Sequence, residues 1–502
     1  MNQFFAKKPL HVLLEELEGE NRLRRILGPA ALTSLGVGAI IGTGIFVLTG
    51  IAAHDKAGPA IILSFVFAGI ACVFAALCYA EFASMVPVAG SAYTYAFATL
   101  GELLAWIIGW DLILEYAVAS ATVAHGWSHY FQDFMGIFKY ELLPQFQRSP
   151  LDFNPDTGQF ISTGAWFDLP AIIIALIITA ILVKGIRESA GFNITMVVIK
   201  LAVVLMVIVL GAFYINPANW HPFAPHGYSG LSFFGKTILG EEVHGAPVGV
   251  LAGAAMIFFA YIGFDSVSTH AEEARNPKKD VPIGIIVSLV LCTILYILVA
   301  AVLTGMVPSD KINIDAPVSD AFRQVGLGWA QFIVSLGALS GITSVLLVMM
   351  LSQPRIFLAM ARDGLVPRSF FGAVHEKFRT PWKSTILTGL FVATLGGLLP
   401  LRILAELVNI GTLFAFVVVC SAVLIMRKTN PKAERPFRVP FVPLVPILGI
   451  ITCLILMFSL PVENWLRLFG WLAIGMVIYF AYGRKHSIMH DMIKAENDAA
   501  KK

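Results

Sequence analysis

Long apolar runs recur along the whole sequence, and they constrain the fold more than any other feature. Three of them cover residues 169–183, 197–213 and 283–303, and about 20 apolar residues are needed to cross the hydrocarbon layer of a bilayer. Hydrophobic residues make up 57% of the chain and charged residues only 13%, against about 25% charged in a soluble domain. Because backbone groups in lipid must bond within their own segment, these runs should be helices. The sequence therefore predicts an all-α integral membrane protein.

Twelve segments of this kind divide the chain into a series of membrane spans. We predict spans 1 to 12 at 28–54, 60–86, 102–131, 168–184, 192–214, 247–270, 281–307, 328–361, 382–400, 404–426, 441–460 and 464–483. The predicted organisation is an N-terminal segment 1–27, five spans in 28–214, an external loop 215–246, five spans in 247–426, two spans in 427–483 and a tail 484–502. All five cysteines fall inside apolar runs, which favours small core residues over a disulfide framework.

The distribution of Lys and Arg predicts which side of the membrane each loop occupies. An even number of spans puts both termini on one side, and that side then carries 26 basic residues against eight on the other. An excess of Lys and Arg marks the cytoplasmic face. We therefore expect a multi-pass protein of the inner (cytoplasmic) cell membrane, with segment 1–27 and tail 484–502 both in the cytoplasm.

Glycine interrupts two of the predicted spans at matching positions, five spans apart. Span 1 contains GVGAIIGTGIF at 36–46 and span 6 contains FFAYIGFD at 258–265. Each interior glycine costs a helix roughly 1 kcal/mol relative to alanine. Glycine-interrupted spans in two halves of a chain point to a transporter site, because unwound backbone offers N–H and C=O groups to a ligand. The alternative explanation is close helix packing through small residues.

The backbone groups at the two interruptions predict the kind of ligand. A half-helix that starts after Gly42 presents free N–H groups and a positive dipole end, which suit a carboxylate. Interrupted span 6 presents carbonyl oxygens around Phe259, Ala260 and Ile262, which suit an ammonium group. A carboxylate at one interruption and an ammonium at the other describe an α-amino acid.

Two ionisable residues lie deep in predicted spans, Glu115 in span 3 and Lys200 in span 5. Insertion scales put the cost of such a residue at about 2.5–3.5 kcal/mol at mid-membrane, so other interactions must offset it. One explanation is a structural ion pair or hydrogen bond that holds spans 3 and 5 together. The other is proton coupling: Lys200 replaces a bound sodium ion, donates to span 1 carbonyls when charged and releases them when neutral.

The stretch GLSFFGKT at 230–237 satisfies the phosphate-binding pattern GxxxxGK[ST]. A phosphate-binding loop follows a strand and precedes a helix in a βαβ unit. Here the stretch falls in an external loop between two spans, where ATP is not available. We therefore expect no ATP site, which excludes an ATP-driven pump.

His125 and His129 lie four residues apart at the outer end of span 3. Metal sites use this spacing, but no Cys or further His clusters near them in the sequence. We interpret both as interfacial histidines and expect neither a metal nor an organic cofactor.

Four separated motifs resemble those of the amino acid-polyamine-organocation permeases. They are GVGAIIGTGIF, the stretch PVAGSAYTYAFATLGELLAWIIGWDLILEY from Pro87 to Tyr116, FFAYIGFDSVS and EEARNPKKDVPIGI. The similarity covers about residues 25–485, and within the superfamily it is greatest to bacterial relatives of the cationic amino acid transporters. This resemblance implies a five-plus-five inverted repeat with broken spans 1 and 6, two extra helices, and alternating access around a midplane site.

The same resemblance implies a substrate site at Ile40, Thr43, Gly44, Ile45, Phe259, Ala260, Ile262 and Met349. Thr43 and Gly44 would hold the carboxylate. The carbonyls from span 6 would hold the amino group, and Phe259 would also serve as a gate. Lys200 matches the span 5 lysine of proton-coupled members, and Glu115 matches an acidic residue of the cationic branch.

Met349 marks a departure from the vertebrate cationic transporters, which have two further spans and a small residue at this place. A methionine fills irregular space but offers no strong acceptor to a cationic side chain, whose unpaired burial is costly. We therefore predict that small neutral amino acids such as alanine are favoured over arginine.

The predicted function is a secondary transporter, not an enzyme, that imports L-amino acids with protons rather than sodium as the coupling ion. The alternatives are an amino acid exchanger and an amino acid sensor without significant transport. The expected partners are the amino acid and membrane lipid, with no nucleic acid, and the sequence leaves a small membrane subunit open.

Overall fold

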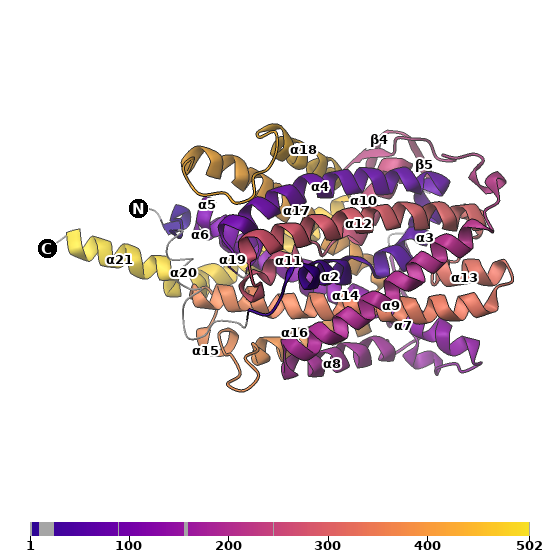
Figure 1. The fold of residues 1–502 in the computed structure, drawn as a ribbon, viewed down its shortest axis with the longest axis horizontal. Helices are drawn as coiled ribbons and strands as arrows, with labels where there is room; N and C mark the ends of the chain where they lie inside the picture. The colour runs from indigo at the N-terminus through magenta and orange to yellow at the C-terminus, as the bar shows by residue number, and fades with distance from the viewer. Residues whose placement is uncertain (1–2, 10–24, 89, 155–158, 244, 501–502) are drawn as a thin grey trace.

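The computed structural model describes residues 3–9, 25–88, 90–154, 159–243 and 245–500, which form a long bundle of helices (Figure 1). Most of the predicted N-terminal segment 1–27 lies outside these residues. The first half of the chain contains helical elements η1 (Gln3–Phe5), α2 (Pro29–Ile40), η2 (Gly44–Leu48), α3 (Thr49–Ala52), η3 (Ala53–Ala57), η4 (Gly58–Ala60), α4 (Ile61–Met85), α5 (Ala92–Thr99), α6 (Glu102–Ile113), η5 (Leu114–Val118), α7 (Ala119–Ile137), η6 (Pro144–Phe146), α8 (Leu169–Lys184), α9 (Ile186–Ala212) and η7 (Pro217–Trp220).

The second half continues with α10 (Val250–Ile257), η8 (Phe258–Tyr261), α11 (Ser266–Thr269), η9 (Ala271–Glu273), α12 (Pro277–Met306), η10 (Ser309–Lys311), α13 (Pro317–Gln324), α14 (Gly328–Arg362), α15 (Arg368–Phe371), α16 (Trp382–Leu398), α17 (Leu401–Thr429), α18 (Leu444–Phe458), α19 (Val462–Ile478), η11 (Tyr479–Gly483), α20 (Arg484–His486) and α21 (Ile488–Ala500). Strands β1 (Leu151–Asn154) and β2 (Gln159–Ser162), β3 (Leu231–Phe233) and β4 (Lys236–Leu239), and β5 (Glu241–Val243) and β6 (Ala246–Val248) pair as three antiparallel hairpins in the loops.

Helix occupies each of the twelve ranges in which a span was predicted. By length and apolar composition, eight helical stretches in the described part of the chain are able to cross a membrane, and α8 and α18 are shorter apolar helices. The helical membrane class is therefore supported. The count of twelve crossings, the segment boundaries and the inverted repeat stay predictions.

The phosphate-loop pattern at 230–237 forms a β-hairpin. Strands β3 and β4 pair Phe233 with Lys236 across a turn in which Phe234 and Gly235 have φ of 52° and 76°. No helix follows this turn, because β4 leads into β5. The stretch thus lacks the strand–loop–helix geometry of a phosphate site, as the sequence predicted.

The interrupted helix α2–η2–α3 lies in the middle of the bundle (Figure 1). Helix α12 packs along both α2 and α4, and α14 packs along α2, α7 and α9. The second interrupted helix, α10–η8–α11, meets the first where η8 contacts η2. The packing therefore brings the two glycine-interrupted segments together in the core.

Ion pairs join segments at the end of the bundle that carries η1 and α21, which we call the termini end (Figure 1). Glu272 and Glu273, after α11, pair with Arg362 and Arg355 of α14, at 2.9 and 2.6 Å. Lys8 pairs with Asp363 at 2.5 Å. We call the opposite end, where β4 and β5 lie, the hairpin end.

Candidate functional site

Backbone packing fixes where the two interrupted helices meet. A Cβ atom added to Gly44 would lie 2.4 Å from the Cα of Ala260, and one added to Gly42 would lie 2.4 Å from a methyl group of Val345 in α14. Both distances are far below van der Waals contact. Gly42 and Gly44 therefore allow span 1 to approach span 6 and α14 closely. Close packing through glycine and a binding site are thus two explanations for one segment, and they do not exclude each other.

The chain leaves regular helix at both interruptions. Helix α2 ends at Ile40, and Ile41 is extended with φ −76° and ψ 102°. In span 6, Ile262 is extended with ψ 133° and Gly263 has φ +122°. A Cβ at Gly263 would lie 2.8 Å from that of Ala39, so only glycine fits this turn. At each break the regular hydrogen-bond ladder of the helix stops inside the core.

A tyrosine hydroxyl joins the two interruptions. The Tyr296 hydroxyl of α12 lies 2.6 Å from the carbonyl oxygen of Ile40 and 2.8 Å from that of Ala260. A hydroxyl has one proton and can donate to only one of these oxygens at a time. The other oxygen remains available to a donor such as an ammonium group. Sequence reasoning missed this residue, although a buried tyrosine usually has a hydrogen-bond partner.

The predicted carboxylate contacts also lie in the core. Ile40, Thr43, Gly44 and Ile45 are buried, and the Thr43 hydroxyl has no hydrogen-bond partner among the residues described. The methyl group of Thr43 packs against Gly126 of α7, where a Cβ would lie 2.6 Å away. A buried hydroxyl without a partner favours a ligand at this point, and an anion can accept its hydrogen bond.

The predicted span 6 residues are brought beside Met349. Phe259, Ala260 and Ile262 are buried, and the Ile262 N–H donates to the Phe259 carbonyl at 3.2 Å. The Met349 methyl carbon would lie 2.9 Å from a Cβ on Gly263. Met349 therefore faces the interruption of span 6 rather than the outside of the bundle.

Lys200 reaches span 1 from α9. Its ammonium donates to the carbonyls of Gly38 and Ile41, both at 2.9 Å, and to the hydroxyl of Ser344 in α14 at 2.7 Å. The side chain is fully buried, and its three N–H donors match three acceptors. Ser344 was not predicted, because a serine in an apolar span carries no pattern that names its partner.

Glu115 belongs to a cluster of buried carboxyl groups that does not include Lys200. It is buried beside two other carboxyl groups, Asp265 of span 6 and Asp111 of α6, and the Tyr116 hydroxyl donates to Asp265. No ion pair joins Glu115 to Lys200 in the part of the chain that the structure describes. These two residues therefore do not hold spans 3 and 5 together by the ion pair that was considered.

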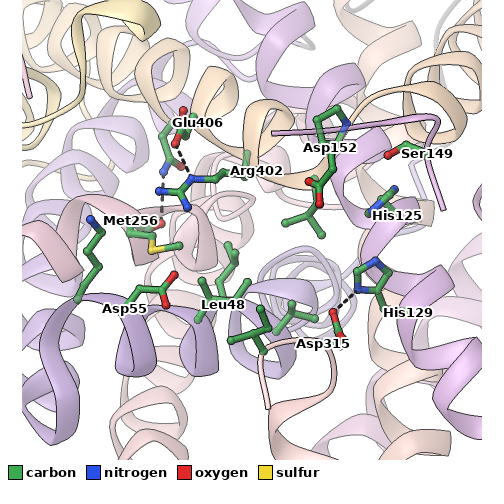
Figure 2. Close-up of a pocket in the computed structure, with 18 of the residues that line it drawn as sticks. Leu48, Asp55, His125, His129, Ser149, Asp152, Met256, Asp315, Arg402 and Glu406 are labelled. Carbon is green, nitrogen blue, oxygen red and sulfur yellow. Dashed lines mark hydrogen bonds and ion pairs between the residues drawn. The ribbon is translucent and has the colours of Figure 1, made fainter. Parts of the chain in front are cut away.

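A cavity of about 780 Å³ opens between the interrupted helices and the hairpin end. Val47 and Leu48 of span 1, Met256 of α10 and Asn409 of α17 are among its lining residues. Figure 2 shows Arg402, Glu406 and Asp55 on one side and the two histidines on the other. The cavity leads from the hairpin end toward the interrupted segments.

The two histidines line this cavity as parts of separate pairs. The His125 ring lies 3.2 Å from Asp168, and the His129 ring lies 3.5 Å from Asp315. No group of three or more metal-binding side chains occurs among the described residues. The structure thus offers no support for a metal at this histidine pair.

Known proteins are similar to this chain over most of its length. A profile of the amino acid permease family matches residues 27–481. The chain is 48% identical to the branched-chain amino acid permease BcaP of Bacillus subtilis (strain 168), over 96% of this chain and 98% of that protein. It is 46% identical to the methylthioribose transporter of the same organism, over 98% and 100%. It is 38% identical to the human cationic amino acid transporter 4, over 84% and 63%.

Proposed function

Because this chain belongs to the amino acid permease family, we propose that it imports L-amino acids by symport with protons. It is a membrane transporter and not an enzyme. The proposal adds alternating access around the two interrupted helices, in a cell membrane with the termini end in the cytoplasm. The cavity at the hairpin end then opens to the outside.

The observation that carries the coupling proposal is the position of Lys200. Its ammonium spans the Gly38 and Ile41 carbonyls on the side of the interruption where α2 ends. Loss of one proton leaves an amine with fewer donors than the three acceptors around it. Protonation of Lys200 therefore favours one arrangement of the span 1 backbone. Through this residue a proton gradient can drive the conformational cycle.

The substrate class follows from the polar groups at the interruptions. A carboxylate is assigned to the Thr43 hydroxyl and the Gly44 backbone, and an ammonium to the carbonyls of Phe259, Ala260 and Ile262. Both groups belong to every α-amino acid. Methylthioribose carries neither, so these contacts favour an amino acid over the substrate for which that relative is named.

Side-chain selectivity is assigned to Met349. Its side chain lies against Gly263 and shortens the space beyond the ammonium contacts. It also gives a guanidinium no acceptor of any strength. We therefore assign the preferred substrates to small neutral amino acids such as alanine, ahead of arginine.

Uptake by the purified protein in liposomes tests the proposal. Proton and sodium gradients are imposed separately, with labelled alanine, leucine, arginine and methylthioribose outside. The expected result is alanine accumulation driven by an inward proton gradient and unaffected by sodium. Uptake that requires amino acid inside identifies an exchanger, binding without uptake identifies a sensor, and uptake of methylthioribose alone overturns the amino acid assignment.

A further inference from the structure

We propose that the cavity at the hairpin end contains a second amino acid site, formed by Arg402, Glu406 and Asn409 of α17. This inference rests on the proposed transport of amino acids. The three residues lie four and three positions apart, which places them on one face of the helix, and all three line the cavity. Figure 2 shows Arg402 and Glu406 near Met256 and Asp55 on the same side of the cavity.

The charged side chains on this face of α17 leave one guanidinium group available to a ligand. Arg402 lies 3.3 Å from one Glu406 oxygen, and Arg467 lies 3.4 Å from the other. Two guanidinium groups thus share a single carboxylate, and both contacts are longer than the 2.7–2.9 Å usual for such bonds. Arg467 donates to Asn464 as well, whereas Arg402 lines the cavity. Arg402 is therefore placed to bind an incoming carboxylate.

Asn409, which also lines the cavity, has an unpaired acceptor. Its side chain is 3% exposed, and its amide nitrogen donates to the carbonyls of Ala255 at 3.1 Å and Met256 at 3.3 Å. Those two bonds require the N–H₂ group on that side, so the amide oxygen points elsewhere. That oxygen is buried and has no hydrogen-bond partner among the described residues. Leaving a buried acceptor unpaired is costly, which favours a ligand that donates to it.

The two halves of this site match a zwitterion. Arg402, positioned by Glu406, suits the carboxylate, and the unpaired Asn409 oxygen suits the ammonium. Leu48 and Met256 form an apolar wall on the same cavity and suit an apolar side chain. A simple carboxylate or amine satisfies only one half. The ligand class is therefore a free α-amino acid with a neutral side chain.

The position of Asn409 connects this outer site with the central one. Its amide holds carbonyls at the end of α10, and the interrupted segment η8 begins directly after α10. An amino acid that leaves the Asn409 oxygen has to move from the end of α10 along η8 to reach the carbonyls of Phe259 and Ala260. The outer site acts as a place where the substrate waits before entering the central site.

Binding to full-length protein with the central site blocked tests the inference. In Gly44→Leu protein, saturation-transfer NMR should still detect L-alanine, with signals for propionate and ethylamine several-fold weaker. Adding Arg402→Gln should remove the alanine signal. Adding Arg467→Gln instead should keep it, because Arg467 contacts Glu406 but is not among the residues that line the cavity.

The outcomes separate this inference from the proposed function. Alanine binding to the parent but not to Gly44→Leu protein, or an alanine signal that survives Arg402→Gln, overturns the outer site and leaves transport intact. A parent that binds no amino acid overturns both. If Gly44→Leu protein does not fold, uptake kinetics replace NMR: Arg402→Gln should raise KM about tenfold, as expected for loss of one charge-assisted bond, with kcat kept. An unchanged KM contradicts the inference.

Discussion

Gly44 and Ala260 meet backbone to backbone where the two interrupted helices touch, and a Cβ on Gly44 would lie 2.4 Å from the Cα of Ala260. The two residues are 216 positions apart in the chain, so this contact depends on how the whole bundle packs. Any side chain at Gly44 must separate the two segments, and with them the groups assigned to the substrate carboxylate and ammonium.

We therefore expect Gly44→Leu to abolish uptake of every amino acid, because the main-chain groups are common to all of them. The measurement is uptake of a panel of labelled amino acids in liposomes. The matched control is Gly191→Leu in α9, where an added Cβ meets nothing within 4 Å. Loss of one substrate with retention of others would show that Gly44 reads side chains instead.

Tyr296→Phe should lower stability while leaving substrate affinity within about threefold of the parent. The hydroxyl supplies one proton to two carbonyls, so its loss leaves one more buried carbonyl unpaired both with and without substrate. An unpaired buried acceptor costs about 1–3 kcal/mol. Thermal unfolding and equilibrium binding of alanine measure the two effects. In Tyr79→Phe, the control, the lost hydroxyl has no partner among the described residues, and stability should not fall. A Tyr296→Phe protein that is stable but binds no alanine would place the hydroxyl in direct contact with substrate.

Lys200→Ala should keep amino acid binding and lose the acceleration of uptake by an inward proton gradient, because its ammonium contacts span 1 carbonyls and a serine hydroxyl. Lys200→Gln keeps N–H donors without a titrating group, so it should transport at a rate independent of pH. The measurement is initial uptake rate against external pH. Lys383→Ala is the control, since this half-buried lysine also donates to a backbone carbonyl, that of Ser369. Undiminished proton-driven accumulation in Lys200→Ala removes Lys200 from the mechanism.

Glu115→Gln should change the pH profile of uptake. The substitution keeps the shape of the side chain but removes one titrating group from the buried carboxyl cluster with Asp111 and Asp265. Glu376→Gln, at an exposed position, should leave the profile unchanged. A Glu115→Gln profile that overlays the parent would assign Glu115 a purely structural role.

Met349→Ser should admit longer substrates, including arginine, while keeping the contacts to the amino acid backbone. The change removes volume next to Gly263 and adds a hydroxyl that can accept a hydrogen bond. Competition of alanine binding by a panel of amino acids measures the effect. Met350→Ser is the matched control, one residue along the same helix. Strong arginine competition in the parent, or identical panels for parent and Met349→Ser, contradicts this assignment.

Sequence reasoning located the two interruptions because glycine is unusual inside an apolar span. The same logic singled out Lys200 and Glu115, since a charge in the membrane requires a compensating partner. The family and the helical class also followed from motifs and apolar runs that are continuous in the sequence. Each of these features is local, so it can be read without knowing which helices are neighbours.

The partners of those residues could not be read in this way. Tyr296, Ser344 and Asn409 are polar residues in largely apolar helices, and no spacing identifies what they bind. The Tyr296 hydroxyl reaches Ile40 only because α12 packs along α2. The ion pair that we considered between Glu115 and Lys200 does not form. Helix packing directs Lys200 toward α2 and α14 instead, and the sequence does not show that packing. The assignment of individual substrate contacts stays a prediction.

Under the proposed alternating access, the ion pairs at the termini end determine how that end opens. Glu273 and Arg355 are nearly fully buried, as is the Glu272 partner of Arg362. A buried charge that loses its partner strongly destabilises the protein, whereas a hydrated ion pair contributes little to stability. Partial opening is therefore the costly state, since it separates the charges before water reaches them. Passage between the closed and open forms should be all-or-none, so that intermediates with a half-open termini end are too rare to let ions leak across the membrane.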